Sequence, residues 1–359
     1  RAQEQSPRLL AHLVARLLIC VHQTGVTSPL TAQELCTVFL AEYFNHGPLE
    51  GLLQNPQCRE ILINDYQTVF IDLGGGLKPH LSAFQSEQAY LAWLQRLITQ
   101  CGKRLDLQSP MAEATLADGS RLQAALSPVA GTSAIVSIRK FCGGPLSETD
   151  LLKHQALDPA ALAIIKTLVS ERKNILVSGG TSSGKTTFLN SLCLFVDPLD
   201  RIVTIEDIFE LKIPLPNVVA LQCRSPNNEG AGQITLDQLL KTSLRLRPDR
   251  LILGECRGSE VLELLSAMNT GHPGSMSTIH ANSAQDAILR LELLALRFSA
   301  NAQHNAIQHW ITGSIDHIIH MVRRSDGRRQ VLEILDLKSK KLIYRSDEES
   351  CFKPNPPLN

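Results

Sequence analysis

Lys173-Asn-Ile-Leu-Val-Ser178 leads directly into Gly179-Gly-Thr-Ser-Ser-Gly-Lys-Thr186, and this stretch decides the fold. Its first half is an apolar run that predicts a buried strand, and a helix is expected over 187–195. The second half matches G-x-x-x-x-G-K-T in the strand–loop–helix setting that this motif requires. Its glycines let backbone N–H groups surround phosphate oxygens, and the helix N-terminus adds positive potential. The stretch therefore predicts a phosphate-binding loop for ATP.

The chemistry of the loop assigns roles to its side chains. Lys185 is expected to reach the β- and γ-phosphates, and the hydroxyl of Thr186 is expected to bind Mg²⁺. The residues predicted to bind the nucleotide are Gly179, Gly180, Thr181, Ser182, Ser183, Gly184, Lys185, Thr186 and Thr187.

Two further predicted strands end on acidic residues, at 201–205 before Glu206 and at 250–253 before Glu255. Ligands gather at the carboxyl ends of parallel strands, so both carboxylates are expected to face the loop. Glu255 occupies the Walker B position and is assigned to Mg²⁺, through a bridging water. Glu206 is assigned as the general base, because RecA-like ATPases place that group on the neighbouring strand. The two roles can be exchanged.

His280 ends a short strand predicted over 275–280, after a glycine-rich turn at 271–274. We expect this histidine to lie beside the γ-phosphate and to act in catalysis. The alternative is a structural histidine that hydrogen-bonds core groups. Arg247 and Arg257 lie before and after the strand that carries Glu255, and bracing of the acidic cluster is one role open to them.

Composition narrows the class of protein. The 359 residues include 35 basic and 35 acidic side chains, whereas a dedicated nucleic-acid binder usually carries a basic excess. We therefore expect no direct nucleic-acid binding. The apolar runs are far shorter than a membrane span, and no signal peptide is visible. None of the nine cysteines forms a CxxC pair, so a reduced, cytosolic chain without structural zinc is expected.

The rest of the chain predicts a second, smaller α/β domain before the loop. Its expected elements are strands at 60–64, 68–72, 112–117, 120–126 and 134–139 and a helix at 85–100, with Asp118-Gly119 as a hairpin turn. Strands and helices then alternate to about residue 340, which predicts a parallel sheet with helices on both faces.

The predicted fold class is therefore α/β: a RecA-like P-loop ATPase domain with a smaller N-terminal α/β domain, preceded by a helical segment. The expected divisions are a helical segment at 1–46, the N-terminal domain at 47–141, a hinge linker at 142–150 around Cys142-Gly-Gly-Pro145, the ATPase domain at 151–345 and a frayed tail at 346–359.

With the P-loop, three further segments resemble the secretion ATPase superfamily of type II secretion, type IV pili and type IV secretion. They are TIEDIFEL (204–211), LILGECRG (251–258) and GSMSTIHANS (274–283). Within it, the chain is most similar to the CpaF-type Tad/Flp pilus assembly ATPases over about residues 47–340. The segments SPMAEATLADGSRL (109–122), SIRKF (137–141) and DHIIHMVRRSDGRR (316–329) carry this likeness.

The chain departs from that family in two places. The strand at 218–224 holds Arg224 as its only arginine, where the family is richer in arginine. SPVA (127–130) replaces a double-proline segment. These departures put the arginine contacts between subunits in doubt.

The resemblance implies a hexameric motor that hydrolyses ATP with Mg²⁺, with nucleotide bound between the two domains. It implies that Arg121 and Arg139 of the N-terminal domain face the nucleotide and act in catalysis. It also implies a cytoplasmic protein, peripheral at the bacterial inner membrane, that powers pilus assembly through an inner-membrane platform protein. Two alternatives remain: a type IV secretion traffic ATPase that moves protein or DNA, and a non-hydrolysing nucleotide switch. The pilin or effector, and extension or retraction, stay open.

Overall fold

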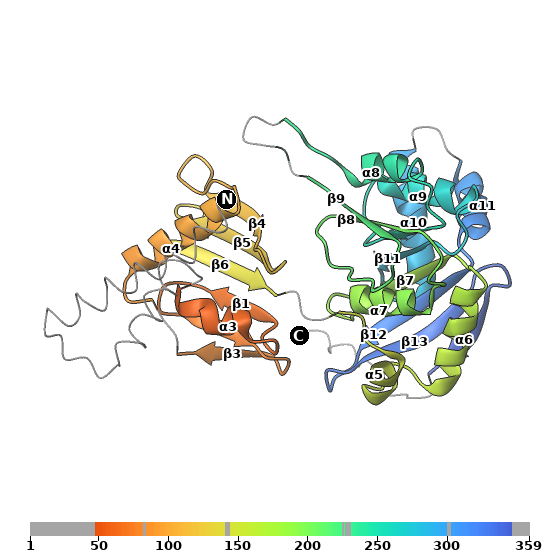
Figure 1. Ribbon diagram of the computed structural model, residues 1–359, viewed down its shortest axis with the longest axis horizontal. Coiled ribbons are helices and arrows are strands. Elements are labelled where there is room, and N and C mark those ends of the chain that lie inside the picture. The colour runs from red at the N-terminus through yellow and green to blue at the C-terminus, as the bar shows by residue number, and fades with distance from the viewer. Residues whose placement is uncertain are drawn as a thin grey trace, which may run out of the picture. The chain divides into compact units, whose positions relative to one another are not determined.

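Two compact units make up the chain, residues 1–142 and 143–359, and each has its own sheet and core (Figure 1). The computed structural model describes residues 47–81, 84–140, 144–224, 226, 231–299 and 303–346. The helical segment expected over 1–46, the Cys142–Gly143 part of the expected hinge and the tail after Ser346 lie outside these residues.

The first unit is built on a six-stranded sheet in the order β3-β2-β1-β6-β5-β4, in which every neighbouring pair is antiparallel. Its elements are η1 (Gly47–Leu49), α3 (Glu50–Gln54), β1 (Glu60–Ile63), β2 (Val69–Asp72), β3 (Leu77–His80), α4 (Glu87–Gln100), β4 (Met111–Thr115), β5 (Arg121–Leu126) and β6 (Ala134–Arg139).

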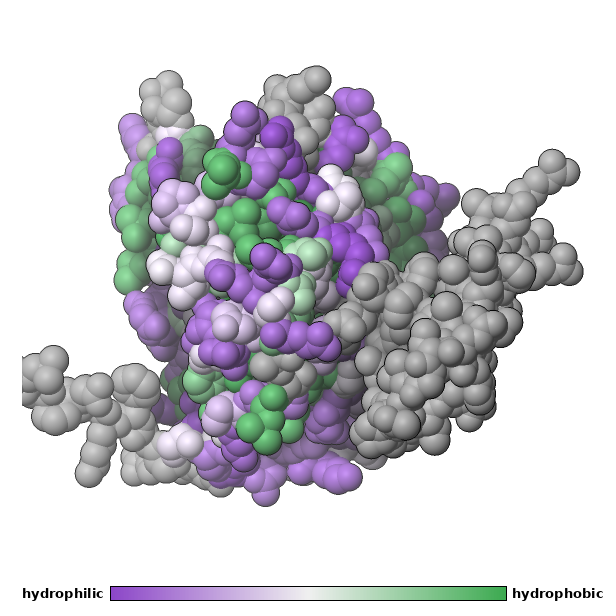
Figure 2. Space-filling view, turned by 90° about the vertical axis from the view of Figure 1, so that its left-hand side faces the viewer, coloured by the Kyte–Doolittle hydropathy of each residue, from purple (hydrophilic) through white to green (hydrophobic). Residues whose placement is uncertain are grey.

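One face of this sheet is covered by α4. Ser86 caps the helix by accepting from Ala89 N at 3.1 Å, and Tyr90, Trp93 and Leu97 pack toward the strands. Alternate strand residues such as Ile138 are buried in the same cluster, so the residues between them point to the other face. On the side shown in Figure 2, hydrophobic side chains lie in small groups between hydrophilic ones.

The hairpin predicted at Asp118-Gly119 joins β4 to β5. Gly119 has φ +87°, which glycine tolerates, and Asp118 Oδ1 accepts from Ser120 N at 2.9 Å. The strand β3 was not predicted. It carries Pro79 at the edge of the sheet, where no neighbour needs the missing N–H, and its residues are largely exposed.

The second unit is built on an eight-stranded sheet in the order β14-β13-β12-β7-β11-β10-β8-β9. Its strands are β7 (Ile175–Gly179), β8 (Ile202–Glu206), β9 (Val218–Gln222), β10 (Arg250–Leu253), β11 (Met276–His280), β12 (His317–Arg323), β13 (Arg329–Asp336) and β14 (Lys341–Arg345). Its helices are α5 (Glu148–Lys153), α6 (Pro159–Ser170), α7 (Lys185–Leu192), η2 (Cys193–Phe195), α8 (Leu236–Ser243), α9 (Glu260–Asn269), α10 (Ala284–Phe298) and α11 (His304–Ser314).

The six strands β12, β7, β11, β10, β8 and β9 are parallel to one another, as the alternating pattern predicts, but the sheet also has an antiparallel edge. There β13 and β14 are antiparallel to their neighbours. Only residues 324–328 join β12 to β13, which is too short for the crossover that a parallel pair needs.

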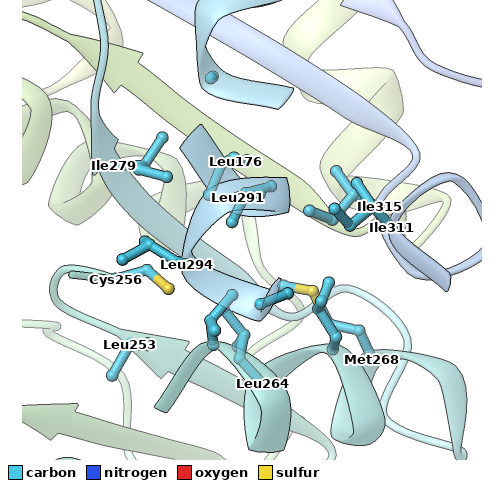
Figure 3. Close-up of a cluster of buried hydrophobic side chains, with 14 of the residues drawn as sticks. Leu176, Leu253, Cys256, Leu264, Met268, Ile279, Leu291, Leu294, Ile311 and Ile315 are labelled. Carbon is cyan, nitrogen blue, oxygen red and sulfur yellow. The ribbon is translucent and has the colours of Figure 1, made fainter. Parts of the chain in front are cut away.

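Helices cover both faces of this sheet. On one face α8, α9, α10 and α11 bury a large apolar cluster, part of which Figure 3 shows: Leu264 and Met268 of α9, Leu291 and Leu294 of α10 and Ile311 of α11 surround Leu176, Leu253 and Ile279 of the strands. On the other face Leu189 of α7 and Ile165 of α6 pack on Val177. Each such side chain stabilises the fold by roughly 1.5–3 kcal/mol. Among the described helices, none combines the length and the apolar character that crossing a bilayer requires.

A buried ion pair fixes the ends of the strands opposite the phosphate loop. Arg250, at the start of β10, is 1% exposed and donates to Asp200 Oδ2 at 2.7 Å and to the Val169 carbonyl at 3.0 Å. Gly274 has φ +81°, and a Cβ there would lie 2.6 Å from Arg250 Nη1. The turn before β11 therefore requires glycine to make room for the arginine.

Candidate active site

Two glycines give the loop after β7 its shape because other strands approach them closely. A Cβ on Gly179 would lie 2.5 Å from the Met321 carbonyl oxygen. Gly184 has φ +91° and is the N-cap of α7, and a Cβ there would lie 2.9 Å from Arg329 Cδ. A larger residue at Gly179 would force the loop away from the β12 backbone, and one at Gly184 would displace the Arg329 side chain or the loop.

Inside the loop, Lys185 Nζ donates to the carbonyl oxygens of Gly179 and Gly180, each at 2.9 Å. Ser183 Oγ donates to the same Gly180 carbonyl at 2.9 Å. The helix α7 begins at Lys185, two residues before the predicted start, so the first backbone N–H groups of the helix lie within the motif. Such groups have no acceptor inside the helix and are the ones that bind anions.

The other predicted binding residues lie at the rim of the loop. Thr181, Ser182 and Thr187 are exposed, whereas Thr186 is half-buried at the second position of α7. A half-buried hydroxyl at a helix N-terminus can approach a bound metal ion and stay accessible to phosphate.

The sheet order ranks the predicted catalytic residues by distance from the loop. The strand β11, which ends at His280, is the neighbour of β7; β10, which precedes Glu255, comes next, and β8, which ends at Glu206, follows. Strands are spaced about 4.8 Å apart, so β10 and β8 run about 10 Å and about 14 Å from β7. Glu206 therefore starts one strand farther from the loop than Glu255.

Hydrogen bonds tie these strand ends together. Ala281 N, next to His280, donates to the Gly179 carbonyl at 3.3 Å. Thr278 Oγ1 donates to the Gly254 carbonyl at 2.7 Å, and Gly254 N donates to the Ile205 carbonyl at 2.9 Å. The ends of β7, β11, β10 and β8 are thus held in one fixed row.

His280 shares its electrostatic environment with two other candidates. Partial burial lowers its pKa, the Lys185 ammonium lowers it further, and the Glu255 carboxylate acts in the opposite direction. The imidazole is therefore neutral near pH 7, with one ring nitrogen as a donor and the other as an acceptor.

Glu206 is buried, at 2% exposure, and its carboxylate holds its own loop closed. Oε2 accepts from the backbone N–H groups of Glu210 at 2.7 Å and Leu211 at 2.8 Å, and Oε1 accepts from Thr204 Oγ1 at 3.1 Å. Burial raises the pKa of this carboxyl group, and these hydrogen bonds oppose the rise. The carboxylate therefore fixes the acidic segment that follows β8.

Glu255 is more accessible, with 35% of its side chain exposed. Arg257 Nη1 lies 3.9 Å from Glu255 Oε2, and Nη2 of the same guanidinium forms an ion pair with Asp207. Arg257 thus braces the acids that follow β8 and β10. Arg247 is exposed, at φ +55°, in the loop before β10.

Arg121 and Arg139 belong to the first unit, where the structure places them side by side. They stand directly opposite each other in the β5–β6 register, and Glu60 of β1 stands opposite Arg139 on the other side. Since alternate residues such as Leu122 and Ile138 enter the core, both arginines lie on the face of the sheet away from it. The sequence could not reveal this pairing, because it depends on the register.

Arg329 also contacts the phosphate loop, although no motif in the sequence assigns it to the site. It begins β13, and its Nε donates to the carbonyl of Ser182, a residue with φ +58°. The arginines at 323–324 and 328–329 mark a basic hairpin in the sequence. That signal does not show that the hairpin folds back onto the loop.

The donors near the loop fit Mg²⁺. The hydroxyl of Thr186 and the carboxylate of Glu255 are oxygen ligands, which this ion prefers. Among the described residues no group of three or more His, Cys, Asp or Glu side chains could hold a metal ion. In phosphoryl-transfer sites Mg²⁺ is held by one or two protein oxygens together with phosphate oxygens and water.

Comparison with known proteins decides the family. The family model described as "Type II/IV secretion system protein" matches residues 42–354. The chain belongs to this family of secretion ATPases. The predicted resemblance to the superfamily is confirmed, and so is the α/β fold with an N-terminal domain and a RecA-like ATPase domain. The CpaF-type subclass stays a prediction.

Two relatives and one solved structure illustrate the family. A provisionally named conjugal transfer protein of Mycobacterium tuberculosis (strain CDC 1551 / Oshkosh) is 36% identical over 307 residues, covering 84% of this chain and 87% of the relative. The type IV secretion system protein PtlH of Bordetella pertussis is 32% identical over 261 residues, covering 65% of this chain and 77% of PtlH. The pilus retraction motor PilT, solved with bound ADP, has a TM-score of 0.54 at 22% identity, covering 78% of this chain and 79% of PilT. For secretion ATPases, nucleotide binding at the loop is the property that the family implies.

Proposed function

We propose that this secretion ATPase hydrolyses ATP in a Mg²⁺-dependent reaction at the loop of residues 179–187. The observation that carries the proposal is the order of the strands. The strand β11, which ends at His280, lies next to β7, and β10, which precedes Glu255, lies next to β11. A loop alone explains binding only, whereas hydrolysis needs a group that accepts a proton from water.

The loop and helix α7 bind and orient the phosphates through backbone N–H groups and Lys185. Bound Mg²⁺, approached by Thr186, would neutralise charge on the β- and γ-phosphate oxygens. The attacking water forms a bond to the γ-phosphorus while the bond to the bridging oxygen breaks, and ADP leaves with that electron pair. His280 supplies a ring N–H for a hydrogen bond to the transferring phosphoryl group.

We assign the general base to Glu255 rather than to Glu206, and we assign Glu206 a structural role in place of the catalytic one expected from the sequence. Glu255 is one strand closer to the loop and partly exposed, so water can reach its carboxylate. Glu206 is buried, and both of its oxygens accept hydrogen bonds from its own segment. In this arrangement Glu255 takes the proton of the attacking water, and Glu206 holds the acidic segment in place.

We further propose that turnover drives a homohexameric motor for pilus assembly of the Tad/Flp type, acting on an inner-membrane platform protein from the cytoplasmic side. The segments 109–122, 137–141 and 316–329, which resemble the Tad/Flp pilus assembly ATPases, support this role. The alternative, a traffic ATPase that moves protein or DNA, is favoured by the relatives named for conjugal transfer and type IV secretion.

Phosphate release from purified protein with ATP and Mg²⁺ tests the enzyme. Lys185→Ala should abolish turnover, because the cation that contacts the β- and γ-phosphates is lost. No phosphate release by the parent chain, together with measurable ATP binding, would establish the nucleotide switch instead. Light scattering with and without nucleotide tests the hexamer, and a fully active monomer would exclude it.

Deletion of the gene tests the cellular role. Loss of surface pili with secretion intact supports the pilus motor, and loss of transfer or effector export with pili intact supports the traffic ATPase.

A further inference from the structure

Behind the phosphate loop, the second unit buries a polar cluster that the proposed reaction does not use. His320 of β12 is 2% exposed, Ser178 of β7 is fully buried and Glu333 of β13 is 9% exposed. Burying polar groups costs free energy unless they form hydrogen bonds, so the partners of these three side chains indicate what the cluster does.

The first contact joins the cluster to the phosphate loop. His320 stands opposite Ser178 in the β12–β7 register, and His320 Nδ1 lies 2.9 Å from Ser178 Oγ. Ser178 immediately precedes Gly179, whose carbonyl accepts from Lys185. The hydrogen bond therefore fixes the last side chain of β7 at the point where the loop begins.

The second contact joins the cluster to the segment that carries His280. Glu333 stands opposite His320 in the β12–β13 register, and its Oε1 accepts from Ala284 N, at the start of α10, at 3.0 Å. Residues 281–284, which follow His280, are thereby tied at both ends, since Ala281 N donates to the Gly179 carbonyl. The loop and the segment after His280 are thus each held by a buried side chain, and these two side chains, His320 and Glu333, stand opposite each other in the β12–β13 register.

A β-bulge lies at the same place. The β12–β13 register shifts between His320 and Met321, and the Met321 carbonyl is the group that closes on Gly179. Bulges beside functional sites turn a strand locally and direct its side chains. The extra residue is Leu332 of β13, so the bulge lies next to Glu333, the member of the cluster that β13 supplies.

The charge state of His320 suits a fixed support. Burial lowers its pKa and Lys185 lowers it further, while Glu333 and Asp286 act in the opposite direction. The imidazole is neutral near pH 7 and can hold one tautomer against the Ser178 hydroxyl.

We propose that His320 is a positioning residue of the nucleotide site: it holds the phosphate loop through its hydrogen bond to Ser178, and it lies opposite Glu333, which fixes the segment after His280. The proposal rests on the proposed ATPase function. Loss of His320 should lower kcat more than nucleotide affinity, because Lys185 and the loop N–H groups that bind phosphate remain.

The test compares kcat and ADP affinity in four variants. His320→Ala should lower kcat about five- to tenfold with the ADP dissociation constant within about threefold of the parent, the scale of one buried hydrogen bond. His320→Asn should recover most of kcat, since its amide reaches the position of Nδ1. Ser178→Ala should lower kcat in the same direction, and adding it to His320→Ala should cost little more.

His317→Ala is the matched control. His317 is buried in the same strand, but it stands opposite Ile175 at the far end of β7 from the loop. It should destabilise the fold with kcat unchanged. Equal kcat losses in His317→Ala and His320→Ala would reduce His320 to a core residue and overturn the proposal.

Hydrogen exchange separates this inference from the proposed function. In His320→Ala, amides of residues 179–187 and 281–284 should exchange faster than in His317→Ala, whether or not the parent turns over ATP. An inactive parent would refute the ATPase alone. An active parent, with kcat of His320→Ala within twofold and unchanged exchange, would refute the positioning role alone. If His320→Ala does not fold, Ser178→Ala and His320→Asn decide by the same two measurements.

Discussion

Glu255→Gln should lower turnover and Glu206→Gln should lower stability, although each removes one carboxylate charge from the same edge of the sheet. Glu255 is partly exposed and can take a proton from water, so its amide variant should lose turnover about 10²- to 10⁴-fold while it still binds ATP. The assay is phosphate release at saturating ATP and Mg²⁺, with nucleotide binding measured separately.

Glu206→Gln should instead act on stability. The glutamine oxygen can still accept from the N–H groups of Glu210 and Leu211, and its NH₂ can donate to Thr204 Oγ1, but the charge assistance is lost. We expect a loss of about 1–3 kcal/mol in the free energy of unfolding. For a unit of this size that lowers Tm by about 3–10 °C. Turnover should stay within about tenfold of the parent.

Glu210→Gln is the control, because it removes a charge from the same acidic segment without touching either carboxylate. Its turnover and Tm should both stay near those of the parent. If Glu206→Gln abolishes turnover while Glu255→Gln keeps it within tenfold, the assignment made from burial and strand order is wrong and the roles revert.

Three further outcomes are expected. Gly274→Ala should lower Tm of the second unit by about 10–20 °C in calorimetry. An alanine in the left-handed backbone conformation and the displacement of the buried Arg250 together cost about 4–6 kcal/mol, and a decrease in Tm of less than about 3 °C would contradict this. Arg139→Ala should keep ATP binding but lose most turnover and most ATP-dependent change in distance between labels on the two units, whereas unchanged values would make it a surface residue. Burial lowers the pKa of His317 and of His320, so the free energy of unfolding should fall as pH drops below about 6.5, where the unfolded chain binds protons that the folded chain does not. Urea titrations should show a shallower fall with pH in the variant that carries asparagine at both positions. An equal fall in the parent and the variant would exclude the two imidazoles as the cause of the pH dependence.

The sequence predicted what depends on local pattern. The loop of residues 179–186, the strands that end at Glu206, Glu255 and His280, and the hairpin at 118–119 each follow from a contiguous motif. Their positions at one edge of the sheet follow from the parallel strands alone.

What could not be predicted depends on contacts between distant residues. The burial of Glu206 reflects how its carboxylate closes the segment to Leu211, which no spacing reveals. The antiparallel edge and the approach of Arg329 to Ser182 depend on a short hairpin that folds across the sheet. The pairing of Arg121 with Arg139 likewise depends on strand register, and a slip of one residue would move every side chain of the strand to the other face of the sheet.

The close approach of β12 and β13 to the two loop glycines has a consequence for biosynthesis. Gly179 and Gly184 meet Met321 and Arg329, which the ribosome adds long after the motif itself. A nascent chain that ends before β12 therefore carries the whole phosphate-binding motif without the walls that shape it. We expect ATP to stabilise the chain against proteolysis only once residues 317–329 have emerged, so nucleotide would act late in the maturation of each newly made subunit.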